Sequence, residues 1–111
     1  MAYSAVARFV ETPVFSRRLQ GLLSDDDYRA LQLALVFRPE QGVLIPGTGG
    51  LRKLRWSLRG KGKRGGLRVI YYWKSAEEVI YLLFLYSKNQ QGDLTPDQLR
   101  WLTRTLEEDL K

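Results

Sequence analysis

The stretch GGLRKLRWSLRGKGKRGGLRVIYYW, residues 49–73, decides the fold. Its first part alternates as a strand does, its last part is rich in β-branched and aromatic residues, and a segment of glycine and lysine joins them. Leu51, Lys53 and Arg55 share one parity, so one face of the first strand is basic. The sequence therefore predicts two neighbouring strands, over residues 51–56 and 67–73, that gather charge on one surface.

The same region carries positive charge that no acidic residue offsets. The 111-residue chain has 18 Lys and Arg against 12 Asp and Glu, a formal net charge of +6. No Asp or Glu lies between Gln41 and Ala76. Half of the 18 basic residues fall in that interval: Arg52, Lys53, Arg55, Arg59, Lys61, Lys63, Arg64, Arg68 and Lys74. A polyanion such as nucleic acid is the natural partner of such a surface, although charge runs more often mark a solvated face.

Composition limits the possible chemistry. Hydrophobic residues at 44% and charged residues at 27% are typical of a globular protein, and the length suits one domain over residues 1–111. The chain has no Cys and no His, which excludes disulfides and thiolate catalysis and removes the usual general base and metal ligand. The longest apolar run, Val79–Tyr86, is far shorter than the ~20 residues that span a bilayer. We expect a cytoplasmic protein without a membrane partner, metal or cofactor.

Apolar spacing predicts the remaining elements. In chain order we expect a short strand that includes Val6, Phe9 and Val10, helices over residues 13–23 and 24–37, a loop over 41–50, strands over 51–56, 67–73 and 79–86, and a helix over 95–110. Ser24 with Asp27, and Thr95 with Gln98, have the spacing of capping boxes at helix starts. The order β-α-α-β-β-β-α predicts an α+β fold in which helices pack on one face of a largely antiparallel, twisted sheet.

Three segments resemble the RelE/ParE toxin superfamily and, within it, HigB-like toxins. They are GTGGLRKLRW at 47–56, GKGKRGGLRVIYYW at 60–73 and YLLFLYSKNQQGDLT at 81–95, within a likeness that runs from Phe9 to Leu106. The resemblance implies a RelE-like fold and a bacterial toxin that enters the ribosomal A site and cuts mRNA. It also implies a cognate antitoxin, HigA-like with a helix-turn-helix DNA-binding domain.

The resemblance further implies a metal-independent cleavage in which the 2′-hydroxyl attacks the adjacent phosphate. Such a reaction needs a base for the hydroxyl, positive charge for the phosphorane and an acid for the leaving oxygen. The catalytic residues expected are Lys53, Arg55, Lys63, Arg68, Tyr86 and Lys88, and the RNA-binding residues are Arg52, Arg59, Lys61, Arg64, Lys74 and Asn89.

The missing histidine affects the assignment of roles, because some family members use one as the base. Here we expect Lys53 or Lys63 to take the proton, since close cationic neighbours disfavour the charged form of a lysine. Arg55 and Arg68 then stabilise the phosphorane, and Tyr86 or Lys88 orients the substrate or protonates the leaving oxygen.

Two other functions fit the same fold. A ParE-like gyrase-inhibiting toxin is disfavoured by the dense basic set on the middle strands. A noncatalytic RNA-binding or ribosome-binding module is favoured by the absence of histidine.

Overall fold

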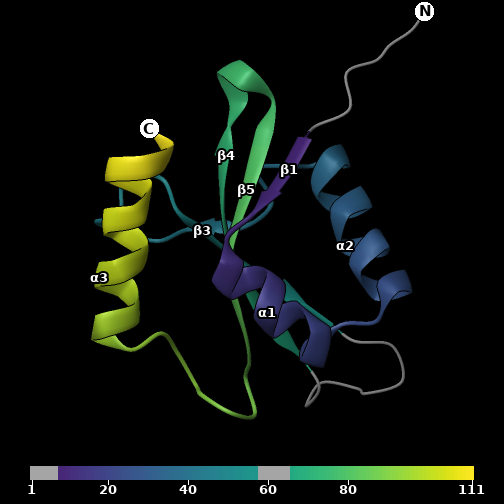
Figure 1. The fold of residues 1–111 in the computed structure, drawn as a ribbon. Coiled ribbons are helices and arrows are strands. Elements are labelled where there is room, and N and C mark those ends of the chain that lie inside the picture. Colours follow the sequence, from purple (N-terminus) through teal and green to yellow (C-terminus); the bar gives the residue numbers. More distant parts are fainter. Residues whose placement is uncertain (1–7, 58–65) are drawn as a thin grey trace, which may run out of the picture.

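The computed structural model describes residues 8–57 and 66–111, which form a five-stranded sheet and three α-helices (Figure 1). In chain order the elements are β1 (Arg8–Glu11), α1 (Pro13–Leu22), α2 (Asp25–Phe37), β2 (Val43–Leu44), β3 (Arg52–Trp56), β4 (Leu67–Lys74), a short 3₁₀ turn η2 (Ser75–Glu77), β5 (Val79–Ser87), α3 (Pro96–Thr105) and a π turn η3 (Leu106–Leu110) that prolongs α3. The predicted α+β class is confirmed. Val6, expected in the first strand, lies outside the described residues. None of the helices described is long and apolar enough to cross a membrane.

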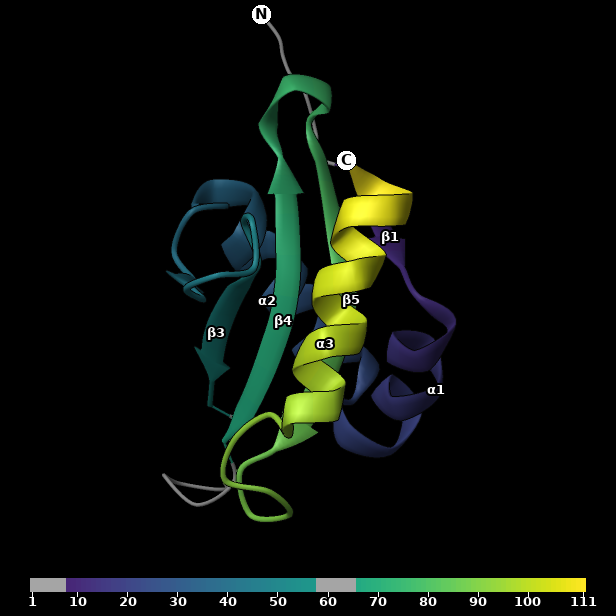
Figure 2. The same cartoon turned by 90° about the vertical axis from the view of Figure 1, so that its left-hand side faces the viewer.

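The strands are ordered β1-β5-β4-β3-β2 in the sheet. Strands β3, β4 and β5 form the antiparallel meander, whereas β1 pairs in parallel with β5 at one edge. Figure 2 shows the β4–β5 hairpin running along the molecule. The prediction of a loop throughout residues 41–50 was wrong, because Val43 and Leu44 form β2 and pair with Lys53 and Arg52.

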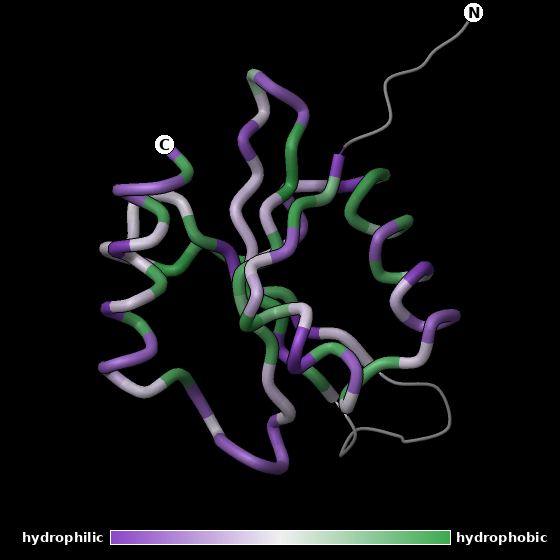
Figure 3. The backbone as a smooth tube through the Cα atoms, viewed as in Figure 1, coloured by the Kyte–Doolittle hydropathy of each residue, from purple (hydrophilic) through white to green (hydrophobic). Residues whose placement is uncertain are grey.

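The helices pack on both faces of the sheet, which corrects the prediction that they share one face. Helices α1 and α2 cover a core that includes Val69 and Leu85, and α3 covers the opposite core, which includes Ile70 and Phe84 (Figure 1). The pairing of β4 with β5 has a register shift between Ile70 and Tyr71. The central strands are buried on both faces, and the apolar segments of the chain meet there (Figure 3). A nearly continuous apolar run such as Val79–Tyr86 is the sequence pattern of a doubly covered strand.

Side-chain caps begin the helices where the sequence predicts them. Ser24 Oγ accepts a hydrogen bond from Asp27 N at 3.1 Å. At the start of α3 both halves of the capping box form: Thr95 Oγ1 accepts from Gln98 N at 3.1 Å, and Gln98 Oε1 accepts from Thr95 N at 3.0 Å. The cap fixes the direction in which α3 leaves the β5–α3 loop.

Helix α1 covers the part of the β5 edge that β1 leaves unpaired. The pairing of β1 with β5 ends at Leu82. Beyond it, Thr12 Oγ1 donates to Leu83 O at 2.7 Å and Arg18 Nε donates to Leu85 O at 2.7 Å. These bonds satisfy backbone acceptors that an open sheet edge would expose, and they fix the last residues of β5.

Candidate active site

Strands β3, β4 and β5 place Arg55, Arg68 and Tyr86 in one row across the sheet. Arg55 is paired with Arg68, and Arg68 with Tyr86. Residues directly opposite each other in antiparallel strands point to the same face, with Cβ atoms about 5 Å apart. The face is the one that α3 covers further along the strands, because Tyr86 belongs to the core beneath that helix. Two predicted cations and the predicted tyrosine therefore lie side by side.

Lys53 extends this row on the same face, and Lys88 follows just past the end of β5. Lys53 is two residues from Arg55 on β3 and so keeps its parity, whereas Lys88 is the first residue of the turn after β5. Lys88 N donates to Gly66 O at 3.2 Å, which continues the β4–β5 pairing past the end of β5. We call Lys53, Arg55, Arg68, Tyr86 and Lys88 the site row. It brings together five of the predicted catalytic residues.

The hydroxyl of Tyr86 is unusual within the row. The side chain is fully buried, and its oxygen makes no hydrogen bond of ordinary length and angle among the described residues, although Asp93 is close enough for a hydrogen bond between the two groups to affect the pKa of each. Burial raises the pKa of Tyr86, and the charge of Asp93 raises it further, while Arg68 opposes the shift. The phenol therefore keeps its proton at neutral pH and is available as a donor.

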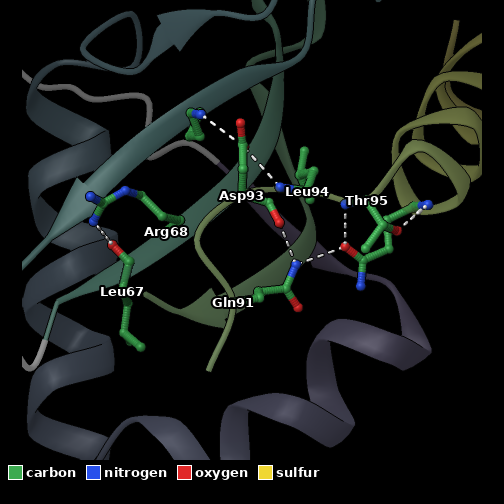
Figure 4. Close-up of polar contacts among 8 residues, drawn as sticks. Leu67, Arg68, Gln91, Asp93, Leu94 and Thr95 are labelled. Atoms are coloured by element: carbon green, nitrogen blue, oxygen red, sulfur yellow. Dashed lines mark hydrogen bonds and ion pairs between the residues drawn. The ribbon is translucent and has the colours of Figure 1, made fainter. Parts of the chain in front are cut away.

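Asp93, in the loop between β5 and α3, contacts the site row although the sequence did not mark it as a site residue. Its Oδ1 lies 3.3 Å from Lys53 Nζ and accepts a hydrogen bond from Leu94 N at 2.8 Å (Figure 4). The bond from Leu94 is the main cause of a lowered pKa at Asp93, and Lys53 adds to it. The carboxylate is thus ionised at neutral pH. Its one sequence signal is that it is the first acidic residue after the basic block on the far side of β5.

The contact with Asp93 changes the argument for Lys53 as the base. That argument required close cationic neighbours, but the ionic contact that the structure gives Lys53 is a carboxylate. Lys53 therefore has a carboxylate as well as cations close to it, and its role as the base stays a prediction. Lys63, the other candidate, lies in residues 58–65, outside the described part of the chain.

Two predicted RNA-binding residues lie away from the site row. Arg52 has the opposite parity to Lys53, and its Nη1 donates to Glu40 O and Gly42 O at 2.8 Å each. Lys74 is at the far end of β4, about 20 Å from Arg68 at a rise of about 3.3 Å per residue. Its Nζ donates to Leu110 O at 3.0 Å. Both side chains therefore bind backbone carbonyl groups of the protein itself.

The other predicted RNA-binding residues lie at the site end of the sheet or outside the described ranges. Asn89 is exposed directly after Lys88, and its backbone N donates to Ser87 Oγ at 3.2 Å. Arg59, Lys61 and Arg64, like Lys63, fall within 58–65. The described neighbours of that segment, Ser57 and Gly66, follow and precede the paired residues Trp56 and Leu67 at the same end of the sheet.

A surface depression adjoins the row at the β3 edge. It has a volume of about 330 Å³ and is lined by Gln41, Val43, Lys53, Leu54 and Arg55. Two cations of the site row therefore also border a hollow that is large enough for a small ligand group.

Comparison with known proteins identifies the family and the fold. A family model described as the RelE toxin of the RelE/RelB toxin-antitoxin system matches residues 36–110. A double mutant of Escherichia coli toxin RelE in the free state has a similar fold, with a TM-score of 0.55 at 13% identity over 79% of this chain and 90% of that one. The archaeal RelE–RelB complex from Pyrococcus horikoshii OT3 contains a chain 26% identical over 78% of this chain and 99% of that one, with a TM-score of 0.49. The chain therefore has the RelE-like fold expected from its sequence and belongs to the RelE family of toxins from toxin-antitoxin systems.

Proposed function

We propose that this toxin is a ribosome-dependent mRNA endonuclease that cuts mRNA in the ribosomal A site. The observation that carries the proposal is the site row, which joins three cations and a buried phenol from three strands on one face, with Lys88 in the turn that follows β5. A phosphodiester gains negative charge as the 2′-oxygen attacks it, and fixed cations stabilise that charge. The reaction leaves a cyclic phosphate and a 5′-hydroxyl and uses no metal.

Each residue of the row has a role in the reaction that suits its side chain. Arg55 and Arg68 stabilise the phosphorane, because guanidinium groups stay charged and bind phosphate oxygens through paired donors. Tyr86 supplies the proton for the leaving 5′-oxygen, since the raised pKa keeps its hydroxyl protonated. Lys53 and Lys88 hold the neighbouring phosphates at the two ends of the row.

The biological setting follows from the same proposal. The protein is a HigB-like toxin of a type II system and acts in the cytoplasm on the ribosome and its mRNA. Its cognate antitoxin is HigA-like, carries a helix-turn-helix DNA-binding domain, and blocks the row with an acidic or amphipathic segment.

The test is cleavage of a reporter mRNA by purified toxin with and without ribosomes, read by primer extension. We expect toxin-dependent cuts that require ribosomes, disappear when the scissile ribose is 2′-deoxy, and persist in EDTA. Arg68→Ala should abolish them, whereas Arg29→Ala, which removes an exposed charge from α2, should not.

Two results would favour the other functions. DNA damage without translation arrest after induction would indicate a gyrase inhibitor. Translation arrest without any cut in the mRNA would indicate a noncatalytic ribosome-binding module.

A further inference from the structure

The proposed reaction needs a group that accepts a proton, and the chain contains no histidine. The lysine and arginine side chains of the site row are donors and carry no acceptor while they are charged. Tyr86 retains its proton, because burial raises its pKa. In the described part of the site, the ionised carboxylate of Asp93 is the group that remains to act as acceptor.

We propose that Asp93 is the catalytic residue that takes the proton from the attacking 2′-hydroxyl, an inference that rests on the proposed endonuclease function. Its carboxylate interacts with residues of the row on two strands, β3 and β5. Oδ1 pairs with Lys53 on β3 at 3.3 Å. The same carboxylate acts electrostatically on Tyr86 on β5. Asp93 thus contacts the row from its β3 side and acts on it at β5 as well.

The carboxylate has an oxygen that Lys53 and Leu94 do not occupy. Oδ1 takes the hydrogen bonds from both of them, whereas Oδ2 takes neither. The Tyr86 hydroxyl is close enough to the carboxylate that a hydrogen bond from it helps to lower the pKa of Asp93. The Asp93 side chain is 73% exposed, so RNA can reach it. A lowered pKa makes Asp93 a weak base but keeps it free of protons across the physiological range. We therefore expect a contribution near the lower end of the ~10²–10⁴-fold range of general bases.

The loop that carries Asp93 is fixed to the start of α3, as general-base catalysis requires (Figure 4). Gln91 Nε2 donates to Asp93 O at 2.8 Å and to Gln98 Oε1 at 2.8 Å. Gln98 Oε1 also accepts from Thr95 N, which is part of the α3 capping box. The position of the carboxylate is therefore set by a helix cap rather than by a free loop.

The proton balance of the step closes with groups of this chain. The 2′-hydroxyl proton moves to Asp93 Oδ2 as the 2′-oxygen forms a bond to phosphorus. The bond from phosphorus to the 5′-oxygen breaks, and that oxygen receives the Tyr86 proton. Afterwards Asp93 releases its proton to water and Tyr86 regains one, so that the protein returns to its starting state.

The test compares Asp93→Asn with wild type in single-turnover cleavage of ribosome-bound mRNA. Asparagine keeps the shape and a hydrogen-bonding oxygen but cannot take the proton. We expect the maximal rate to fall about 100-fold, with substrate affinity unchanged or higher because a negative charge has been removed. Asp97→Asn is the matched control, since Asp97 is also an exposed acid of this region and pairs with Arg100 away from the row. An unchanged rate in Asp93→Asn would overturn the proposal.

Two further measurements separate the base from other roles. If Asp93 acted only by holding Lys53, Asp93→Asn would add no loss to a Lys53→Met variant, and the proposal would fail. A substrate with a 5′-bridging sulfur leaving group needs no acid, so it should restore Tyr86→Phe but not Asp93→Asn. Restoration of Asp93→Asn by sulfur would overturn the assignment. The proposed function itself fails separately, if wild-type toxin makes no cut at all.

Discussion

Replacement of Arg68 by Gln should weaken the salt dependence of RNA binding by a predictable amount. Each phosphate that a cation neutralises on a single strand contributes about −0.7 to the slope of log K against log[salt]. The four cations of the site row therefore account for about −2.8, and Arg68→Gln removes about 0.7 of it. Between about 50 mM and 200 mM KCl, the wild type should lose about 2.6-fold more affinity than the variant.

Fluorescence anisotropy with a short 2′-O-methyl RNA measures this slope without cleavage, because the blocked 2′-oxygen cannot attack. Arg52→Gln is the informative control. It removes the same charge from the residue next to Lys53. The Arg52 side chain, however, lies on the other face of β3 and binds the backbone of Glu40 and Gly42. Its slope should equal that of the wild type. Equal slopes for Arg68→Gln and the wild type, or an equal reduction in Arg52→Gln, would refute the placement of the RNA on the α3 face.

Three predictions concern stability. Tyr71→Phe should lower the free energy of unfolding by about 1–3 kcal/mol in urea denaturation, because the buried Gly42 N loses its acceptor, the Tyr71 hydroxyl at 2.8 Å. Burial and Glu11 raise the pKa of Tyr28, so its contribution is complete below the unfolded value of about 10 and is lost as pH rises beyond it. Thermal unfolding from pH 8 to 11 should show a steeper alkaline loss in wild type than in Tyr28→Phe. Thr95→Ala should cost about 1 kcal/mol as a lost helix cap and also slow cleavage by loosening the β5–α3 loop, which a single-turnover assay measures.

Local sequence signals predicted most of the fold. Helix starts such as Ser24 and Thr95 are determined by short-range hydrogen bonds, and the meander by runs bounded by turn residues. What the sequence could not give was the side of the sheet on which each helix packs. The run Val79–Tyr86 was identified as a strand, but its continuous apolar character also meant that both faces are covered. β2 was missed because a strand of two residues, Val43–Leu44, is too short to show an alternating pattern.

The sequence predicted only part of the candidate site, because it does not assign each side chain to a face of the sheet. Charge counting finds the basic block but does not say which face each side chain occupies. Parity already separated Arg52 from Lys53 and Arg55, and the structure gives Arg52 a structural contact. Asp93 was missed because a lone acid in a loop carries no pattern, and only the folded chain brings it to Lys53 across 40 residues of sequence.

Tyr86 is where the core and the site row meet, and its position has an energetic consequence. Its ring is fully buried in the core beneath α3, yet its hydroxyl makes no hydrogen bond of ordinary length and angle within the described ranges. A buried hydroxyl without a hydrogen bond costs about 1–3 kcal/mol, so phenylalanine would serve the core at least as well. Stability alone therefore does not explain the hydroxyl. The proposed function supplies a reason for it, because there the hydroxyl gives its proton to the leaving 5′-oxygen. The neighbouring arginines pose the same question, because Arg55 and Arg68 are paired across β3 and β4 and like charges directly opposite each other are destabilising. In the proposed function, the phosphodiester that they bind offsets this repulsion.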